Sequence, residues 1–313
     1  MYHAVDSLPE AAPLPIRDVA AAYDQAGGDY IAYADGDPQR LFAFDGPHGY
    51  ADRRVWSIIE AKLRELRAAG ASAVSILDAG CGAGTWLRRA VTAAHSLGFA
   101  TIMARGFDLA DAQLRSARAM AAELARLPGV NLTFEVADLT ERLPEADASA
   151  DLTLCLYSVL SHLPVARLPG VVAELARVTR GHFVTSVRAV GSTPTIFVSS
   201  LDRASRFQLD HGSDLCEFEL CDGRRMELRF HLFSASELRS YFAPRFEIEG
   251  LLGLDIFHHR FQPDARWNPP ALALDRALQR RLEQLEESHA GDPSFMNRAN
   301  HLLLVGRARR TGA

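Results

Sequence analysis

The sequence has few cysteines, and it lacks long apolar runs. No two of its four cysteines are separated by the two-residue gap of zinc ribbons and redox motifs, so we expect reduced, structural thiols in a cytoplasmic protein. No run reaches the roughly 18 apolar residues of a transmembrane helix, which predicts no membrane span. Residues 1–16 are rich in proline and have neither a positive head nor an apolar run, so we expect a flexible N-terminus and no signal peptide.

An excess of basic charge is also missing. The chain has 34 Lys and Arg against 39 Asp and Glu, a net charge of −5, and no basic stripe that could neutralise phosphates. Nucleic acid is therefore not expected as a partner. Apolar residues make up 48% and charged residues 23% of the 313 positions, which excludes a disordered or collagen-like chain and allows a sizeable core.

Short apolar runs alternate with helical patterns from residue 74 onward. This alternation predicts an α/β fold, in which helices cover both faces of a mainly parallel sheet. Two helix starts carry capping signals: Asp111 is the expected N-cap of one helix, and Ser234 with Glu237 predicts a capping box in another. The expected strands are 74–77, 101–107, 130–136, 152–156, 182–187, 246–257 and 301–306, and the expected helices are 85–96, 111–126, 165–178, 234–242 and 271–287.

Two regions stand outside this alternation. Helical patterns at 17–33, broken by a Gly-Gly pair, and at 51–69 predict an N-terminal helical cap over residues 17–70. The main domain then covers residues 71–313 and contains an insertion at about 189–233. Within the insertion, runs at 214–220 and 224–230 flank Cys221-Asp222-Gly223, which favours a tight hairpin turn.

A glycine-rich loop follows the first expected strand of the main domain. It reads Asp78-Ala79-Gly80-Cys81-Gly82-Ala83-Gly84 and leads into a helix. Glycines at such a point let the backbone turn tightly and let a ligand lie against the main chain near a helix N-terminus. The even spacing differs from the G-x-G-x-x-G pattern of dinucleotide-binding folds.

The pattern Asp78-x-Gly80-x-Gly82-x-Gly84 resembles motif I of the class I S-adenosylmethionine-dependent methyltransferases, and the small-molecule members in particular. The resemblance implies a Rossmann-like, seven-stranded sheet with a reversed last strand, and S-adenosylmethionine as cofactor. It also implies that Asp108 binds the ribose hydroxyls and that Asp138 meets the adenine amino group. The cofactor-binding residues expected from it are Asp78, Gly80, Cys81, Gly82, Gly84, Asp108, Leu109, Asp138, Leu139 and Tyr157.

Residues 151–164 resemble the fourth strand of that family and the following turn, which lines the methyl-transfer site. His162 in this turn has a suitable pKa for proton transfer, and Tyr157 has a hydroxyl, so both are candidate catalytic residues. In many relatives, a histidine here shapes the pocket without acting as a base. Tyr157 is equally suited to be a wall residue.

Substrate-binding candidates come from the cap, from the fifth strand and from the insertion: Tyr23, Tyr30, Tyr33, Arg188 and His211. The tyrosines resemble the aromatic cap of small-molecule methyltransferases, although an apolar helix face with polar tips explains each of them as well. We expect no metal site. Asn268-Pro269-Pro270 resembles the Asn-Pro-Pro-aromatic loop of methyltransferases that act on bases or amides, but it follows the sixth strand and not the fourth.

The expected function is methyl transfer from S-adenosylmethionine to an oxygen, nitrogen or sulfur atom of a small molecule, by a monomer or homodimer. Two alternatives stay open. The protein could use the sulfonium for non-methylating chemistry, such as a cyclisation that releases methylthioadenosine. It could also be a non-catalytic partner subunit that keeps the fold, although the intact glycine loop and acidic residues argue against this.

Overall fold

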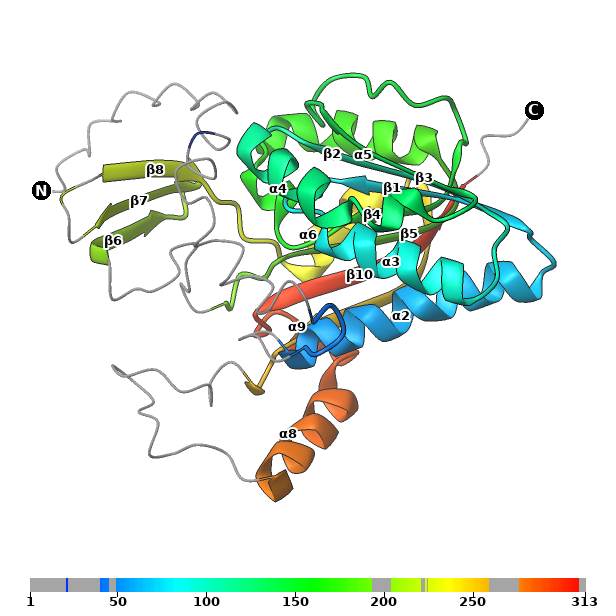
Figure 1. Cartoon of the computed structure of the whole chain (residues 1–313). Coiled ribbons are helices and arrows are strands. Elements are labelled where there is room, and N and C mark those ends of the chain that lie inside the picture. The colour runs from blue at the N-terminus through cyan, green and yellow to red at the C-terminus, as the bar shows by residue number, and fades with distance from the viewer. Residues whose placement is uncertain are drawn as a thin grey trace, which may run out of the picture.

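The apolar runs of the sequence form the strands of one seven-stranded sheet, with the order β3-β2-β1-β4-β5-β10-β9 (Figure 1). The computed structural model describes residues 21, 40–44, 49–192, 204–220, 223, 225–258 and 276–309. The strands of the sheet are β1 Ala73–Ala79, β2 Thr101–Asp108, β3 Val130–Val136, β4 Ala150–Cys155, β5 Thr179–Arg188, β9 Phe246–Leu254 and β10 His301–Ala308.

The pairing of these strands confirms the predicted Rossmann-like sheet. β1 is parallel to β2 and β4, β2 is parallel to β3, and β4 is parallel to β5. β10 runs antiparallel to both β5 and β9, which is the expected reversal of the last strand. The carboxyl ends of β1, β2, β4 and β5 therefore meet at one edge of the sheet, where open α/β sheets bind ligands.

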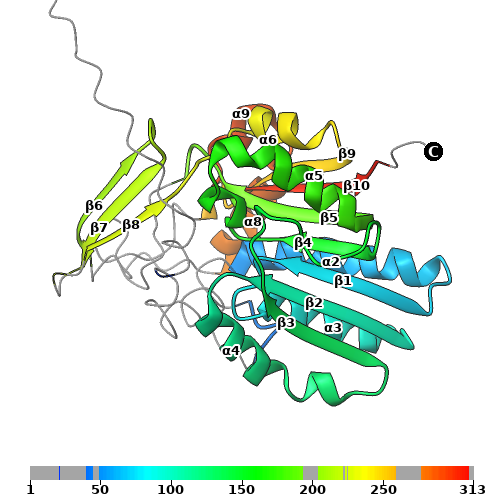
Figure 2. The ribbon, with the colours of Figure 1, turned by 90° about the horizontal axis from the view of Figure 1, so that it is seen from above.

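Helices cover both faces of the sheet, as the continuous apolar runs predict (Figure 2). One core cluster joins the sheet to Val55 and Ile59 of α2, Leu87 of α3 and Leu114 of α4. A second cluster packs α5, α6 and α9 on the opposite face. The helices are α2 Gly49–Ala68, α3 Thr85–Ser96, α4 Asp111–Ala121, α5 Leu168–Val178, α6 Ala235–Phe242, α8 Arg276–His289 and α9 Pro293–Met296, and the 3-10 turns are η1 Leu124–Arg126, η2 Val159–His162 and η3 Val165–Arg167.

The helix predicted at 111–126 begins at the expected residue but differs in its end and in its N-cap. α4 ends at Ala121, and residues 124–126 form the separate turn η1. Asp111 is also not the N-cap, because Ala110 occupies that position and Asp111 lies in the first turn, where it forms an ion pair with Arg115. The carboxylate of Asp108 accepts the Ala110 N–H. This bond stabilises the turn between β2 and α4 and leaves Ala110 as the N-cap.

The observed bounds of the sixth strand and of the helix after it also differ from the predicted ones. β9 ends at Leu254 and not at 257, because Asp255 takes a left-handed conformation with φ +55°. α8 begins at Arg276 within the described residues, and residues 271–275 of the predicted helix lie outside them. The buried Glu286 of α8 accepts backbone N–H groups from residues 256, 257 and 258, which attaches this helix to the end of β9.

The insertion forms a separate three-stranded sheet beyond the carboxyl edge (Figure 2). Its strands are β6 Ala204–Asp210, β7 Leu215–Leu220 and β8 Arg225–Arg229. The sequence predicts β7 and β8 but not β6, whose segment has no Val, Ile or Thr and is half polar. Gly223 has φ +85°, as a tight turn at that point requires.

The remaining predictions for helices fall into three cases. α2 confirms the helix expected at 51–69, and α6 has the predicted capping box between Ser234 and Glu237. The helix expected at 17–33 lies outside the described residues apart from position 21. None of the described helices combines the length and apolarity needed to cross a membrane.

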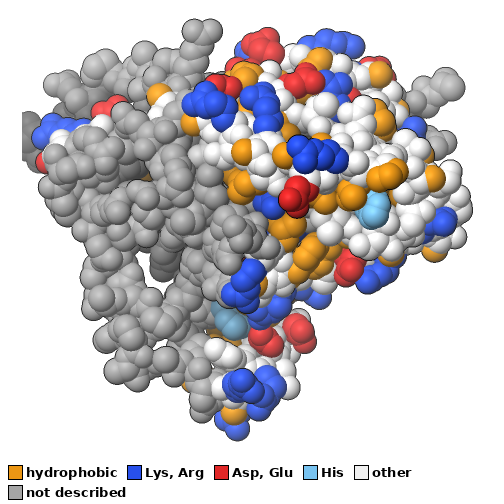
Figure 3. Space-filling view, viewed as in Figure 1, with side chains coloured by type: hydrophobic (Ala, Val, Ile, Leu, Met, Phe, Trp, Pro, Cys, Tyr) orange, Lys and Arg blue, Asp and Glu red, His pale blue; other side chains and the backbone are white. Residues whose placement is uncertain are grey.

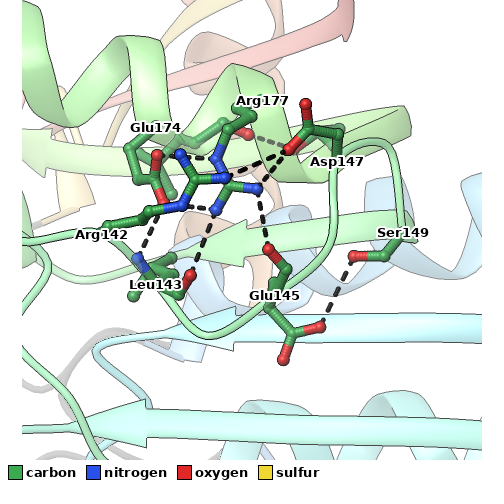
Figure 4. Close-up of polar contacts among 9 residues, drawn as sticks. Arg142, Leu143, Glu145, Asp147, Ser149, Glu174 and Arg177 are labelled. Atoms are coloured by element: carbon green, nitrogen blue, oxygen red, sulfur yellow. Dashed lines mark hydrogen bonds and ion pairs between the residues drawn. The ribbon is translucent and has the colours of Figure 1, made fainter.

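Arg177 of α5 fixes the connection between β3 and β4 (Figure 4). Its guanidinium donates to both carboxylate oxygens of Glu174, to Oδ1 of Asp147 at 2.6 Å, and to the carbonyl oxygens of residues 143 and 145. Glu174 in turn accepts the Leu143 N–H at 2.7 Å. This network orders the segment that begins at the candidate residue Asp138.

Candidate active site

The glycine loop after β1 has the backbone conformation that its sequence predicts. Gly80, Gly82 and Gly84 have φ values of +78°, +51° and +77°, which side chains rarely tolerate. The N–H groups of Gly80 and Cys81 donate to the carbonyl oxygen of Phe107 on the neighbouring strand at 2.7 and 2.8 Å. The loop is therefore held against the end of β2.

The three glycines differ in what surrounds them. A Cβ at Gly80 would lie 2.4 Å from a methyl carbon of Val159, and one at Gly84 would lie 2.7 Å from the Phe134 ring. A Cβ at Gly82 would meet nothing within 4 Å. Gly80 and Gly84 are thus required for packing, whereas Gly82 is the position where a ligand can approach the loop backbone.

Asp108 stands at the end of β2, beside this loop. Its Oδ2 accepts the Gly82 N–H at 2.8 Å, and its Oδ1 accepts the Ala110 N–H at 2.9 Å. The carboxylate therefore joins two strand ends and faces the edge that the resemblance assigns to the ribose. Leu109 follows it and is half-buried.

Asp78 is the most buried of the candidate carboxylates. It is 2% exposed, and among the described residues its Oδ2 has no hydrogen-bond partner. Burial, with a smaller contribution from the charge of Asp108, raises the pKa of Asp78 to about 8, although the Leu87 N–H opposes this. A ligand with a positively charged donor would satisfy this buried acceptor.

Asp138 begins the turn after β3. Its Oδ1 accepts the N–H and the hydroxyl of Thr140 at 2.8 and 2.7 Å, which fixes the turn, and Leu139 packs into the core below it. Arg167 donates to the Thr140 carbonyl at 3.0 Å and adds a second anchor. The structure therefore brings Asp138 to the same edge as Asp108.

Cys81 packs within the glycine loop. Its thiol is buried, and burial, together with the nearby carboxylates of Asp78 and Asp108, raises its pKa well above the ordinary value. A thiol that resists deprotonation is a poor nucleophile. This disfavours a reactive thiol at Cys81, and its predicted contact with the cofactor stays a prediction.

The turn after β4 is held in an uncommon conformation. Tyr157 and Ser158 both have positive φ values, +52° and +71°, which cost free energy in residues other than glycine. Ser186 of β5 compensates, because its hydroxyl accepts the Tyr157 N–H at 2.8 Å and its carbonyl accepts the Ser158 N–H at 3.1 Å. Such strain is common where a side chain must be aimed at a functional site.

The side chain of Tyr157 lies in a polar and aromatic environment. Its hydroxyl donates a short hydrogen bond to Asp52 of α2, and its ring stacks on Trp86 of α3 with a centroid distance of 5.7 Å. The His301 ring meets it edge-on at 5.4 Å. Burial and the neighbouring Asp52 charge raise the pKa of Tyr157 well above its ordinary value, so the phenol stays protonated. The predicted catalytic and cofactor-binding roles of Tyr157 stay predictions.

The His162 side chain contacts β8 of the insertion. It is buried in η2, its Nδ1 donates to the carbonyl oxygen of Arg229 at 2.9 Å, and its ring contacts Phe230. Burial lowers the pKa of His162 to about 4, so the ring is neutral near pH 7. This geometry connects the η2 turn to β8 of the insertion, and the predicted catalytic role of His162 stays a prediction.

The substrate-binding candidates fall in three places. Arg188 ends β5 and is buried opposite His301 on β10, and its Nη1 donates to His301 Nε2 at 3.3 Å. His211 is exposed on the β6–β7 turn. The tyrosines expected to form the aromatic cap, Tyr23, Tyr30 and Tyr33, lie outside the described residues.

Three residues near Tyr157 are not predicted by the sequence reasoning: Asp52, Trp86 and His301. One signal could have found Asp52, because it shares the buried stripe of α2 with Val55, Ile59 and other apolar residues. A carboxylate on such a stripe must have a partner. No comparable signal marks His301.

A family model described as a methyltransferase domain matches residues 76–182. This span contains the glycine loop, Asp108, Asp138 and the turn after β4, and its strands have the order and directions described above. Residues 76–182 therefore form a methyltransferase domain.

Solved structures of other methyltransferases resemble this one at low identity, and no curated protein sequence matches the chain. A magnesium protoporphyrin IX methyltransferase from Synechocystis with bound SAH is 16% identical, with 90% of this chain and 97% of that chain covered and a TM-score of 0.46. The CcbJ methyltransferase from Streptomyces caelestis is 14% identical, with 80% and 95% covered and a TM-score of 0.48.

The residues of the methyltransferase domain fit S-adenosylmethionine. Gly82 leaves the loop backbone accessible, and Asp78 offers a buried oxygen that lacks a partner among the described residues to the positively charged amino group of the cofactor. Asp108 and Asp138 offer carboxylates at the edge where ribose and adenine are expected. When bound, the cofactor supplies an electrophilic methyl group, and the chain's own residues orient it and exclude water.

Proposed function

We propose that this methyltransferase transfers its methyl group to an oxygen, nitrogen or sulfur atom of a small molecule. The observation that carries this proposal is the gathering of Tyr157, Asp52, Arg188 and His301 at the carboxyl edge. Asp52, Arg188 and His301 are buried and Tyr157 is half-buried. Asp52 comes from α2, and the other three come from the sheet and the turn after β4. Such an enclosed set of polar groups suits a small acceptor.

The surface charge supports the same conclusion. Over the described part of the face in Figure 3, basic and acidic side chains are interspersed. Together with the net charge of −5, this disfavours the continuous basic surface that nucleic-acid substrates require. The acceptor is therefore a small molecule in this proposal, and a macromolecular acceptor is the competing outcome of the test.

The chain's contribution to the reaction is alignment. Methyl transfer is an in-line displacement, so the protein must hold the acceptor atom, the methyl carbon and the sulfur in one line. Tyr157 orients groups through its hydroxyl, and Arg188 supplies a positive charge to the same region. A base is needed only for an acceptor that arrives protonated, and the proposed contacts of Tyr23, Tyr30, Tyr33 and His211 with the acceptor remain predictions.

Calorimetry and mass spectrometry test the proposal in two steps. Titration with S-adenosylmethionine and S-adenosylhomocysteine measures cofactor binding, and incubation with pooled small molecules then identifies an acceptor that gains one methyl group. Methylation of a small molecule supports the proposal. Release of methylthioadenosine indicates non-methylating chemistry, methylation of RNA or a protein indicates a macromolecular acceptor, and failure to bind either ligand contradicts the cofactor assignment.

Two variants sharpen the binding step. Asp108→Ala removes the carboxylate at the expected ribose position and should weaken cofactor binding at least about tenfold, since charged hydrogen bonds contribute about 1.5–3 kcal/mol. Asp111→Ala is the matched control, because Asp111 is exposed and pairs with Arg115 on the same helix. Equal affinities for the two variants would remove Asp108 from the site.

A further inference from the structure

We propose that the guanidinium of Arg89 binds a carboxylate of the methyl acceptor, so that the small molecule methylated in the reaction is an organic acid. This inference rests on the proposed function, because it concerns the acceptor of that reaction. Arg89 lies in α3 and is not among the site residues expected from the sequence. The inference therefore adds a specificity-determining residue and names the chemical class of the acceptor.

The first step of the argument is the burial of a permanent charge. Arg89 is 1% exposed, and a buried guanidinium costs free energy unless it is hydrogen-bonded and meets a negative charge. Its Nε donates to the Leu41 carbonyl oxygen at 2.6 Å. Among the described residues, however, its Nη1 has no hydrogen-bond acceptor and no carboxylate forms an ion pair with it. The guanidinium thus offers both a charge and a donor to an anion.

The second step is the way in which aromatic rings hold this group. The central carbon of the guanidinium lies 4.5 Å from the centroid of the Trp86 ring and 4.8 Å from that of the Phe44 ring. Such contacts stabilise a positive charge, but a ring is only a weak hydrogen-bond acceptor. They also fix the guanidinium before a ligand binds. A carboxylate suits it best, because its two oxygens match the planar array of donors in arginine.

The third step is the position of Arg89 beside the proposed acceptor site. Trp86, which contacts the guanidinium, also stacks on Tyr157 with a centroid distance of 5.7 Å. The charge of Arg89 acts on Tyr157 directly, where it opposes the rise in the pKa of the phenol. Asp52 hydrogen-bonds the same phenol, but in the described part of the chain it forms no ion pair with Arg89. Arg89 therefore adjoins the enclosed polar group that carries the proposed function.

The last step concerns the source of the carboxylate, because S-adenosylmethionine carries one at its amino-acid end. That end is expected at Asp78, whose buried Oδ2 has no partner among the described residues and suits the ammonium group. The charge that acts on Asp78 is that of Asp108, and Arg89 does not contribute to the shift in the pKa of Asp78. Arg89 acts on Tyr157 instead. Its position therefore favours the acceptor over the cofactor as the source of the carboxylate.

The test uses two matched pools of small molecules: hydroxy and amino carboxylic acids, and the corresponding primary amides, which keep the shape and remove the charge. With S-adenosylmethionine and the full-length protein, mass spectrometry should show methylation of an acid at least about tenfold faster than of its amide. Arg89→Gln should lower kcat/KM for that acid at least about tenfold and remove the preference for acid over amide. Arg89→Lys, which keeps the charge without the planar donors, should recover part of the preference. Arg64→Gln is the matched control, because Arg64 is exposed on α2 and pairs with Glu60, and it should change neither rate.

The outcomes separate this inference from the proposed function. Equal losses of rate for acid and amide in Arg89→Gln indicate a purely structural role and overturn the inference. A loss of affinity of at least about tenfold for both S-adenosylmethionine and S-adenosylhomocysteine in calorimetry also overturns it, because these ligands share the amino-acid carboxylate. Methylation of amides alone overturns it and leaves the proposed function standing, and no binding of either cofactor ligand to the wild-type protein overturns both. If Arg89→Gln does not fold, Arg89→Lys provides the second measurement, in which an unchanged ratio of acid to amide rates contradicts the inference.

Discussion

The backbone N–H of Gly82 donates a hydrogen bond of 2.8 Å to Oδ2 of Asp108, which joins the glycine loop after β1 to the end of β2. A conformation that only glycine adopts readily thus delivers a donor to a carboxylate on the neighbouring strand. Two groups expected to hold the cofactor therefore position each other before any ligand binds. Such preorganisation lowers the entropic cost of binding.

Alanine substitutions should separate the packing glycines from the ligand-facing one. Gly84→Ala should destabilise the fold by several kcal/mol, because the Cβ would collide with Phe134 and φ is +77°. Gly82→Ala should cost only about 1 kcal/mol of folding free energy, for its backbone conformation, but should weaken S-adenosylmethionine binding at least about tenfold. Urea unfolding and calorimetry measure the two effects, and a folded Gly82→Ala variant with normal affinity would contradict the assignment.

Asp78 should make the stability of the free protein depend on pH. Burial raises the pKa of Asp78 to about 8, above its ordinary 3.8, so between these values the folded state binds more protons than the unfolded state. Stability therefore falls as pH rises through this window. Asp78→Asn should reduce the difference between urea unfolding at about pH 5 and about pH 8. The variant should also bind S-adenosylmethionine more weakly, and an unchanged pH dependence would refute the prediction.

Two roles of His162 can be distinguished by experiment: a catalytic base, or a structural link between the η2 turn and β8. Because burial lowers its pKa to about 4, we expect no inflection near neutral pH in the rate profile that His162→Gln removes. His162→Phe should lower stability by about 1–3 kcal/mol through loss of the bond to the Arg229 carbonyl. A loss of activity above about a hundredfold in His162→Gln, with stability unchanged, would instead establish catalysis.

His231 should make the attachment of the insertion sensitive to alkaline pH. Its Nδ1 donates to Asp214 and its Nε2 to Glu237, both at 2.9 Å. Burial lowers the pKa of His231, but these carboxylates outweigh it and raise the pKa above 6.5. The stabilisation is therefore complete below about pH 6.5 and is lost as pH rises through the folded pKa.

Limited proteolysis measures this effect. Cleavage within residues 204–230 should become faster as the pH rises through the pKa of His231 in the wild-type protein. In His231→Gln the rate should be high and independent of pH in that range, whereas His211→Gln, a change at an exposed histidine on the same sheet, serves as control. Equal pH profiles for the wild type and His231→Gln would exclude the mechanism.

Arg177 should be essential as a guanidinium and not merely as a charge. It makes hydrogen bonds to two carboxylates and two carbonyl oxygens around residues 143–147, and a lysine ammonium has only three donors in a different geometry. Arg177→Ala should lower the free energy of unfolding by about 1–3 kcal/mol, and Arg177→Lys should recover less than half of this loss. Urea unfolding measures both, and full recovery by lysine would show that charge alone suffices.

Part of the site was predictable because its signals are local. The left-handed conformations of Gly80, Gly82 and Gly84 follow from the residue types, and Asp108 and Asp138 follow from their places at strand ends. The prediction was wrong at the N-cap of α4, which is Ala110 and not Asp111, because the carboxylate of Asp108 accepts the Ala110 N–H.

The sequence by itself determined the mainly parallel sheet and the glycine loop, because apolar periodicity and backbone preference act over a few residues. The reversed last strand was expected only from the resemblance to the methyltransferase family. Only the tertiary structure decided what surrounds the side chains. Tyr157 meets Asp52 across 105 positions, and His162 is turned toward Arg229 across 67. These contacts fix the pKa values and roles of the residues, since burial and neighbouring charge are properties of the packed chain and not of the local sequence.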